Sequence, residues 1–280
     1  MQLGCHISVA KGFYKASQRA LELGAGSFQV FTKNPRGLRP KKVDYADAEK
    51  GVEFCRDRGI TLVAHTPYIT NLSTPKEDLH AVTVRSIKED LHIAETYGAV
   101  GAVVHCGKHV GEGEEKGTRL MVETLNEILA DYDGKTLLLL ENTAGQGTEL
   151  GLTIEKLVEI REATDHPEKI GFCFDTCHGF AAGAWDLDTF EDLIGTMEKT
   201  GYLDNLVAIH FNDSKAPFGS RKDRHEKIGQ GEIGAEALTR FLRCERLEGI
   251  PVILETPVDK EDEYAEEIRY LHRLKEGATT

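Results

Sequence analysis

The chain has 280 residues, 40% of them hydrophobic and 29% charged, which is enough apolar material for a sizeable core and excludes a disordered protein. Its formal net charge of −13 argues against a nonspecific nucleic-acid binder, although it leaves room for a local basic surface. No run approaches the roughly 18 apolar residues of a membrane helix, and no signal peptide is recognisable at the N-terminus. We therefore expect an intracellular, cytoplasmic protein with no membrane partner.

Strand-like and helix-like segments alternate along the whole chain. Eight short runs rich in Val, Ile, Leu and Phe have the continuous apolar character of a parallel sheet that is buried on both faces. These expected strands are Leu3–Ile7, Phe28–Thr32, Thr61–His65, Ala102–Cys106, Thr136–Asn142, Ile170–Thr176, Leu206–Asn212 and Pro251–Thr256. Helices are expected around 12–23, 44–58, 74–98, 116–131, 153–164, 188–200, 234–247 and 260–275.

The third helix has the clearest boundaries. Thr74 suits the N-cap, Pro75 suits the first helical position, and Glu77 completes a capping box, while Gly98 marks the end. Eight β/α units without a long linker predict a single (β/α)8 TIM barrel over residues 1–280, a fold that typically needs about 250 residues. A doubly wound open sheet is the alternative, but it usually has fewer strands.

The six cysteines are expected to be reduced thiols. No two of them form a CxxC pair, and Cys5, Cys106 and Cys173 lie inside apolar runs, where a thiol behaves as a small hydrophobic group. We therefore expect neither disulfides nor cysteine ligands to zinc.

Good metal ligands stand at the ends of six of the expected strands. Because the C-terminal ends of barrel strands meet at one mouth, residues far apart in the sequence would surround one small volume there. The strand-end residues are His65, His105, Glu141, Asp175, His210 and Glu255, and His178, Asp223 and His225 follow in the adjoining loops. Four carboxylates packed together without cations would repel one another. Imidazole with carboxylate, without thiolate, suits zinc, manganese or iron in a water-accessible site, and several ions in one mouth suggest phosphoryl chemistry.

At these residues the sequence closely resembles the endonuclease IV family of apurinic/apyrimidinic (AP) endonucleases. The similarity covers nearly the whole chain in family order. It rests on Gly4-Cys5-His6-Ile7-Ser8, Phe31-Thr32-Lys33-Asn34, Glu141-Asn142-Thr143-Ala144-Gly145-Gln146-Gly147, Phe174-Asp175-Thr176-Cys177-His178, His210-Phe211-Asn212-Asp213-Ser214, Asp223-Arg224-His225, Ile228-Gly229-Gln230-Gly231-Glu232 and Ile253-Leu254-Glu255-Thr256. The chain departs from the family at Cys106, where a proline is often found, so the turn after His105 lacks the fixed φ of proline.

The resemblance implies a trinuclear site, usually of zinc, with manganese as an alternative at one or more positions. One ion would be held by His65, His105 and Glu141, the second by Glu141, Asp175, His210 and Glu255, and the third by His178, Asp223 and His225. The family cleaves the phosphodiester 5′ to an abasic site, leaving a 3′-hydroxyl and a 5′-deoxyribose phosphate, and removes blocking groups from 3′ ends. Glu141 or Glu255 would position the nucleophile or take its proton.

Duplex DNA with abasic sites or blocked 3′ ends is the partner that the resemblance implies, and we expect the protein to act as a monomer. Asn34, Arg36 and Tyr68 would contact DNA at the lesion. Two basic loops follow strand ends and are expected to surround the metal site. Their basic residues are Lys33, Arg36, Arg39, Lys41 and Lys42 in the first loop, and Lys215, Arg221, Lys222, Arg224 and Lys227 in the second.

Two other functions remain open at this point. A sugar isomerase or epimerase of the xylose-isomerase-like class would share the barrel and its His/carboxylate strand ends, but it typically lacks the Asp223-x-His225 pair for a third ion. A protein that only binds damaged DNA would have no need for a complete set of metal ligands. His6 and His109 lie near the expected mouth, and the sequence leaves their roles undecided.

Overall fold

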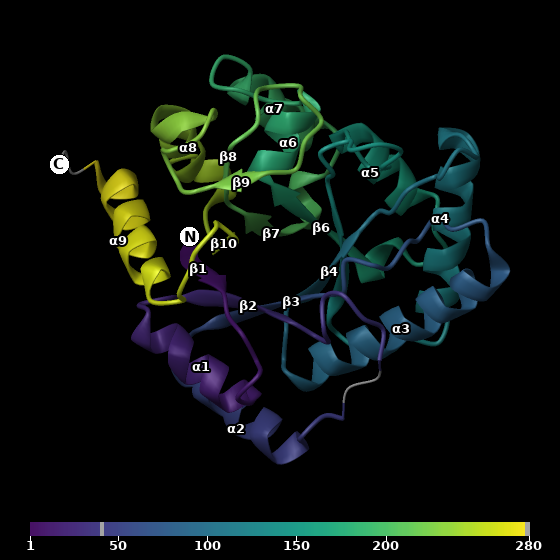
Figure 1. The fold of residues 1–280 in the computed structure, drawn as a ribbon, viewed down its shortest axis with the longest axis horizontal. Helices are drawn as coiled ribbons and strands as arrows, with labels where there is room; N and C mark the ends of the chain where they lie inside the picture. The colour runs from purple at the N-terminus through teal and green to yellow at the C-terminus, as the bar shows by residue number, and fades with distance from the viewer. Residues whose placement is uncertain (40–41, 278–280) are drawn as a thin grey trace.

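The computed structural model describes residues 1–39 and 42–277. In that part of the chain, eight parallel strands close a barrel in the order β1-β10-β7-β6-β5-β4-β3-β2 (Figure 1). The strands are β1 (Gln2–His6), β2 (Ser27–Phe31), β3 (Thr61–His65), β4 (Gly101–His105), β5 (Leu137–Glu141), β6 (Ile170–Asp175), β7 (Leu206–His210) and β10 (Pro251–Leu254). The predicted TIM barrel is confirmed, and its closure through β1 and β10 excludes the open sheet.

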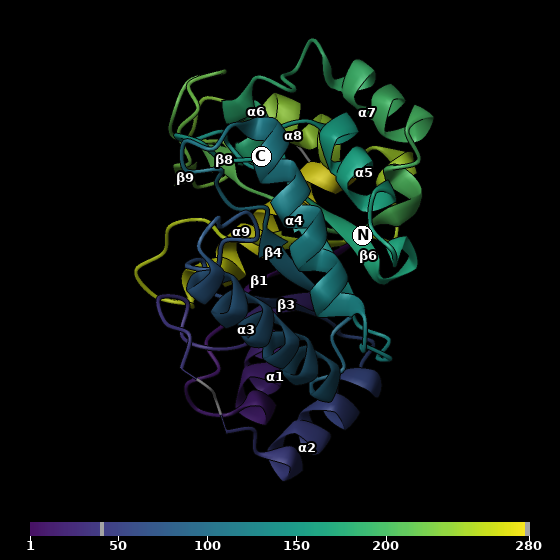
Figure 2. The same cartoon turned by 90° about the vertical axis from the view of Figure 1, so that its right-hand side faces the viewer.

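Helices surround the barrel on its outside (Figures 1 and 2). They are α1 (Phe13–Glu22), α2 (Tyr45–Arg56), α3 (Glu77–Thr96), α4 (Glu114–Leu129), α5 (Ile154–Glu162), α6 (Thr176–Ala182), α7 (Phe190–Lys199), α8 (Gly234–Leu242) and α9 (Glu263–Glu276). Short 3-10 turns at Pro167–Lys169, Leu203–Asn205 and Glu245–Leu247 precede β6, β7 and β10. None of the helices in the described ranges is long and apolar enough to cross a membrane.

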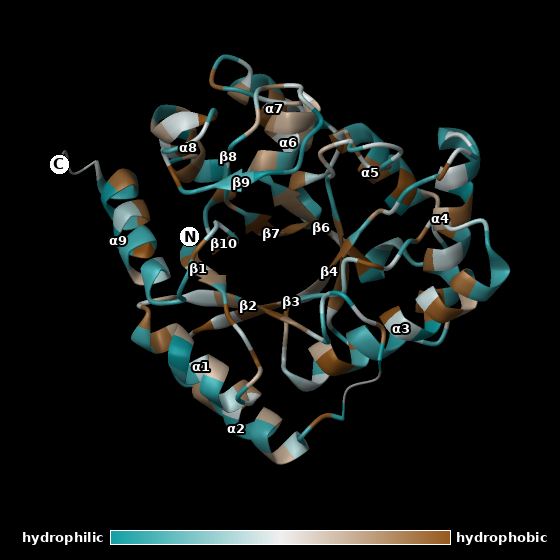
Figure 3. Cartoon of the chain, viewed as in Figure 1, coloured by the Kyte–Doolittle hydropathy of each residue, from teal (hydrophilic) through white to brown (hydrophobic). Residues whose placement is uncertain are grey.

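The interior of the barrel explains why the strand-end residues meet. A separate apolar cluster fills its centre, made of Val63, Val103, Leu139, Cys173, Ala208 and Ile253. Each of these residues lies two positions before one of the six strand-end residues. Because side chains two apart on a strand share a face, the six polar residues also point inward, one layer above this apolar floor. Figure 3 shows the apolar character of the strands against the mixed colouring of the outer helices.

Two local features differ from the sequence prediction. The capping box at Thr74 is wrong: α3 begins at Glu77, Lys76 is its N-cap in an extended conformation, and the Thr74 hydroxyl accepts from the Lys76 amide at 3.4 Å. The strand expected to end at Thr176 ends at Asp175. The Asp175 carboxylate caps α6 by accepting a hydrogen bond from the His178 amide at 2.7 Å, so the helix begins at Thr176. Asp175 therefore ends β6 and begins α6.

The loop after β7 contains a small sheet that the sequence did not predict. β8 (Asp213–Ser214) pairs antiparallel with β9 (His225–Glu226), which brings His225 back over the barrel. β9 and the loop after β10 lie on one side of the barrel, and the N-terminus lies on the other (Figure 2). All six cysteines are buried and free of disulfides in the described structure, as expected.

Candidate metal centre

The structure brings all nine predicted ligand residues to the C-terminal mouth of the barrel. In three sets, each residue offers one ligand atom and these atoms lie within 4.8 Å of one another. The sets are His65, His105 and Glu141; Glu141, Asp175, His210 and Glu255; and His178, Asp223 and His225. They have the same members as the three sets that the resemblance implies, so one network of ligand atoms reaches across the mouth.

Glu141 lies at the centre of this network and is 1% exposed. Its Oε2 is 3.5 Å from His65 Nε2 and 3.1 Å from His105 Nε2. Its Oε1 is 3.0 Å from His210 Nδ1 and 3.3 Å from His178 Nδ1. The carboxylate thus faces both of the first two sets, one oxygen toward each.

The other carboxylates extend the network toward solvent. Glu255 Oε2 lies 3.1 Å from His210 Nδ1. Asp223 Oδ1 is 3.4 Å from both His178 Nε2 and His225 Nε2. Asp175, fully buried, approaches His225 Nε2 at 3.6 Å. Asp223 is the most exposed of these residues, with 43% of its side chain accessible, so the third set lies at the edge of the site.

Main-chain carbonyls fix the orientation of three histidine rings. Nδ1 of His65 lies 2.6 Å from the Thr66 oxygen, Nδ1 of His178 lies 2.9 Å from the Asn142 oxygen, and Nδ1 of His225 lies 3.1 Å from the Glu255 oxygen. A carbonyl only accepts, so each Nδ1 bears a proton, and in the neutral ring each Nε2 keeps a lone pair. The three lone pairs face carboxylates, which is the arrangement of metal-ligating histidines.

Two buried atoms lack the hydrogen bonds that a closed polar network would supply. Within the described residues, Glu141 Oε2 and His225 Nε2 have no hydrogen-bond partner. Buried polar atoms are rarely left unsatisfied, because the desolvation cost is not recovered. A carboxylate oxygen and an imidazole lone pair are both cation ligands, so the residues fit divalent metal ions.

The charges of the network shift the pKa values of its members. Burial alone would raise the pKa of Glu141, but His210 and His105 outweigh it and hold the pKa well below its usual range. Burial would lower the pKa of His178, whereas Asp175 and Asp223 raise it well above its usual range. Without metal, protons on histidines balance the carboxylates, and bound cations would displace those protons.

Cys177 adjoins the site but has the contacts of a neutral thiol. Its sulfur lies near ligand atoms of Asp175 and His225, and it donates to the Arg224 carbonyl at 3.6 Å. Burial raises the pKa of the thiol to about 12. Cys177, Asp175 and His225 thus form a further group whose possible ligand atoms lie within 4.8 Å of one another.

Comparisons with known proteins place the chain in a family. The sequence profile of the xylose isomerase-like TIM barrel family matches residues 17–274. A protein of Symbiobacterium thermophilum, named probable endonuclease 4, is 52% identical over 98% of this chain and 99% of its own length. The chain belongs to the endonuclease IV family. The crystal structure of endonuclease IV from Thermus thermophilus has a TM-score of 0.87 and 32% identity, covering 99% of this chain and 100% of that one.

Sugar epimerases share the barrel with the endonuclease IV family. The crystal structure of a D-tagatose 3-epimerase-like protein has a TM-score of 0.70 at 20% identity, over 99% of each chain. At that level of identity the likeness concerns the fold alone.

Asparagines next to the ligands hold the site together, a role that the sequence analysis missed. Asn142 donates to the Asp175 carbonyl at 3.0 Å and accepts from the Asp175 amide at 2.7 Å. Asn212 donates to Asp175 Oδ2 at 2.8 Å and accepts from the Glu255 amide at 2.8 Å. The sequence signal that could have identified them is their position, because Asn142 is one residue after Glu141 and Asn212 is two residues after His210.

Asp213 anchors the loop that carries Asp223 and His225 of the third set. This carboxylate is fully buried and accepts from main-chain amides of its own turn and of the glycine-rich segment beyond β9. The donors are Ser214, Gly229, Gly231, Ile233 and Gly234, at 2.8–3.4 Å. A Cβ on Gly231 would lie 2.4 Å from the Ser214 oxygen, so the segment requires glycine there.

The predicted DNA-contact residues lie together beside the metal centre. Asn34 Oδ1 accepts from the Arg36 amide at 2.9 Å, and the Tyr68 amide donates to the Pro35 oxygen at 3.0 Å, which ties the two loops to each other. The Tyr68 ring is half-exposed and lies 5.3 Å, centroid to centroid, from His105. A cavity of about 200 Å³ opens beside these two rings.

Lys33 does not belong to the basic surface, and that expectation is wrong. Its ammonium is buried and contacts Ser86 Oγ at 2.8 Å, Glu89 Oε2 at 3.0 Å and Asp90 Oδ1 at 3.2 Å. The side chain points inward because α3 places the carboxylates of Glu89 and Asp90 behind β2. Lys41 lies outside the described residues.

Most of the other basic residues of the two loops are exposed. Arg36, Arg39 and Lys42 are exposed in the first loop, and Lys215, Arg221, Lys222 and Arg224 are exposed in the second. Lys227 differs, because it is only partly exposed and pairs with Glu263 at 2.6 Å. His109 also lies apart from the ligands, accepting from the Gly113 amide at 3.1 Å.

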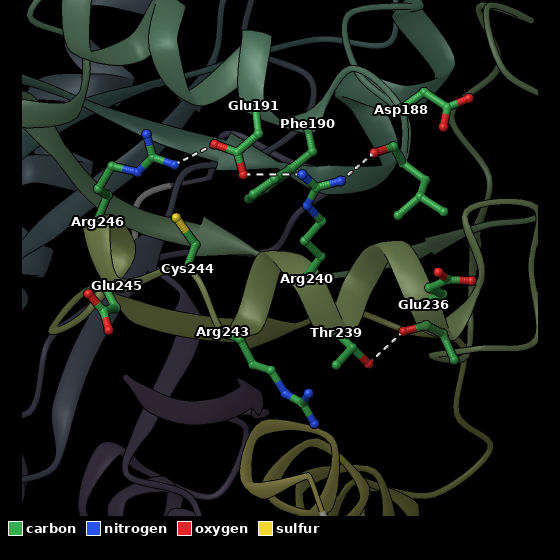
Figure 4. A pocket seen from close by; sticks show the side chains of 12 residues that line it. Asp188, Phe190, Glu191, Glu236, Thr239, Arg240, Arg243, Cys244, Glu245 and Arg246 are labelled. Carbon is green, nitrogen blue, oxygen red and sulfur yellow. Dashed lines mark hydrogen bonds and ion pairs between the residues drawn. The ribbon is translucent and has the colours of Figure 1, made fainter.

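A wide cavity of about 1150 Å³ lies away from this centre, on the outside of α7 and α8 (Figure 4). Its arginines are already engaged: Arg240 and Arg246 pair with Glu191 at 3.3 and 2.6 Å, and Arg243 donates to the Leu274 carbonyl. The cavity includes no member of the three ligand sets.

Proposed function

We propose that the protein is a DNA-repair endonuclease that hydrolyses the phosphodiester 5′ to an abasic site, leaving a 3′-hydroxyl and a 5′-deoxyribose phosphate. It also removes blocking groups from 3′ ends. The site holds three metal ions, zinc with manganese as an alternative at one or more positions, in the three sets described above. The protein acts on duplex DNA as a monomer in the cytoplasm.

One observation carries this proposal: the three ligand sets form a single network that is joined through Glu141 and has histidine nitrogens turned toward carboxylates. Family membership supports it, since the relatives from Symbiobacterium and Thermus bear the endonuclease IV name. The third set distinguishes the site from that of a sugar isomerase, which typically has no need of an Asp223–His225 pair. The unsatisfied atoms at Glu141 and His225 argue against a protein that only binds DNA.

The bound ions would lower the pKa of a water molecule and neutralise charge on the phosphoryl oxygens. Glu141 and Glu255 are the carboxylates proposed to serve the reaction. Glu141 is enclosed by histidines, so its role is to bridge ligand sets. Glu255 keeps 11% of its side chain accessible, which suits it to orient a water at the surface of the cluster or to take its proton.

DNA recognition is assigned to the joined loops at Asn34, Arg36 and Tyr68. An arginine fork and a flat phenol ring can fill the gap left by a missing base, and an abasic nucleotide is extruded at lower cost than a paired one. The exposed basic residues of the second loop would face the phosphates on the other side of the mouth. This local positive surface offsets the overall charge of −13.

The test uses a labelled duplex that contains one stable abasic-site analogue, with the intact duplex as control. Zinc-loaded protein is expected to nick only the abasic strand, and a chelator is expected to abolish nicking. Failure of the metal-loaded protein to nick, together with epimerisation of a ketose, would replace the proposal with the sugar epimerase function.

A further inference from the structure

Gln29 is a buried amide directly beneath the metal centre. It lies in the middle of β2, and its side chain is fully buried. Its Oε1 is 2.8 Å from His210 Nε2, and its Nε2 is 2.7 Å from Glu255 Oε1 and 3.3 Å from His6 Nδ1. Among the described residues, every side-chain hydrogen bond of Gln29 goes to one of these three residues.

The carboxylate of Glu255 decides which way the amide points. A carboxylate only accepts, so the amide NH2 must face Glu255 and the amide oxygen must face His210. In its neutral form, which is the form that binds a cation, His210 therefore carries its proton on Nε2. Its lone pair is on Nδ1, which lies 3.0 Å from Glu141 Oε1 and 3.1 Å from Glu255 Oε2.

The same contacts hold Glu255 and His6. The hydrogen bond at Oε1 leaves Glu255 Oε2 as the oxygen that faces His210. The second amide N–H points toward His6 Nδ1, whose ring packs on Phe31 with centroids 4.4 Å apart. All hydrogen-bonding groups of the Gln29 amide are therefore used, and its rotamer is fixed from three sides.

We propose that Gln29 is a positioning residue for the metal centre: its amide sets the tautomer of His210 and the rotamer of Glu255, so that both offer their free atoms to the same ion. The inference rests on the proposed function. Main-chain carbonyls accept hydrogen bonds from ring nitrogens of His65, His178 and His225. In the described part of the chain, no main-chain carbonyl does so for His210, and the side-chain oxygen of Gln29 takes this role. His6 contacts the amide of Gln29 and belongs to none of the three ligand sets.

The experiment measures metal binding without DNA. Gln29→Met keeps the length of the side chain but removes the amide. Gln2→Met is the matched control, because Gln2 is a glutamine of β1 whose amide donates to the Gly59 carbonyl at 2.8 Å, away from the site. Zinc affinity is measured by competition with a chromogenic chelator, and absorption spectra are recorded after loading with Co2+. The unfolding midpoint in excess chelator shows whether each variant is folded.

Gln29→Met is expected to weaken zinc binding at one position by about 10–100-fold and to change the Co2+ ligand-field bands. Its unfolding without metal should remain cooperative, with a midpoint below that of the control because the buried hydrogen bonds of the amide are lost. If Gln29→Met does not fold, Gln29→Asn takes its place, since the shorter amide cannot reach His210 and Glu255 together. Zinc affinity and Co2+ spectra equal to those of Gln2→Met would overturn the inference.

The test of the role of Gln29 can fail independently of the test of the proposed nuclease function. A parent protein that binds zinc tightly but does not nick abasic duplex refutes the nuclease, while the Gln29 comparison still stands on its metal affinities. A parent protein that nicks DNA, with unchanged zinc binding in Gln29→Met, refutes only the role of Gln29.

Discussion

Glu141 faces histidines of more than one ligand set. Four histidine nitrogens lie within 3.5 Å of its two oxygens, and its place at the end of β5 is fixed by the apolar layer below. A change at this residue therefore disturbs two ligand sets at once, whereas a change at Asp223 disturbs only the outer one.

Glu141→Ala is accordingly expected to be the most damaging ligand substitution, lowering the nicking rate by about 100-fold or more and reducing the metal bound per chain. Glu123→Ala, which removes an exposed carboxylate on α4, serves as the control. Steady-state nicking and elemental analysis are measured on the same preparations. Retention of the full metal content in Glu141→Ala would count against its bridging role.

Lys33 shows how a buried charge affects stability away from the chemistry. Lys33→Met leaves Asp90 buried without its cation and is expected to lower the free energy of unfolding by about 3 kcal/mol at neutral pH. Burial raises the pKa of Asp90 to about 6, although Lys33 and Thr32 oppose the shift. A buried carboxyl whose pKa is raised in the folded state destabilises the fold when charged and ceases to do so when protonated. The loss of unfolding free energy in Lys33→Met should therefore shrink as the pH falls toward 5.

Urea unfolding at pH 5 and pH 8 measures this effect, with the exposed Lys50→Met as the comparison. An equal loss at both pH values would show that Asp90 does not take up a proton in the variant.

At the scale of elements, the loop that contains β8 and β9 carries Asp223 and His225, two of the three residues of the third ligand set. Asp213 holds this loop by five main-chain amides, so we expect the loop to keep its shape when metal is removed. Asp223→Ala or His225→Ala should therefore remove mainly one ion and most of the turnover, while the barrel stays folded. Elemental analysis, circular dichroism and nicking rates test this together. Unchanged nicking in both variants would favour a two-metal site of the isomerase kind.

The joined loops after β2 and β3 are the element that we propose to contact DNA. Arg36→Ala and Tyr68→Ala should weaken binding to abasic duplex and slow its cleavage, but affect short 3′-end substrates less, because those need less distortion of the DNA. If Arg36 merely contacts a phosphate, Arg36→Ala would instead weaken abasic and intact duplex equally and lower the salt slope by about one unit. Affinities for both duplexes over a salt series separate these outcomes.

For the whole molecule, metal removal and pH should act together on stability. The raised pKa of His178 means that its proton stabilises the metal-free fold below the ordinary histidine pKa of about 6.5, and that this contribution fades as the pH rises through the folded pKa. Zinc needs the neutral ring, so its binding strengthens over the same interval. The increase in melting temperature on adding zinc to chelator-treated protein should be larger at pH 8 than at pH 6. An increase that is constant or reversed would contradict the coupling.

The sequence predicted the barrel and the convergence of the ligands because both follow from strand order. Once the β/α alternation is recognised, residues at strand ends such as His65 and Glu255 must share one mouth. The role of Gln29 could not be predicted, because the function of an amide in an apolar strand depends on which side chains of other strands it contacts. The inward turn of Lys33 was missed for the same reason, because it depends on carboxylates of α3 that are more than fifty residues away in sequence.

The chemistry of the two ends produced at an abasic site tests the central claim most directly. A duplex with one abasic nucleotide is incubated with the zinc-loaded protein, and both fragments are identified by mass spectrometry. Hydrolysis on the 5′ side predicts an upstream fragment ending in a 3′-hydroxyl and a downstream fragment beginning with a 5′-deoxyribose phosphate. An upstream fragment ending in an unsaturated aldehyde, the product of elimination on the 3′ side, or the absence of any cut would contradict the account.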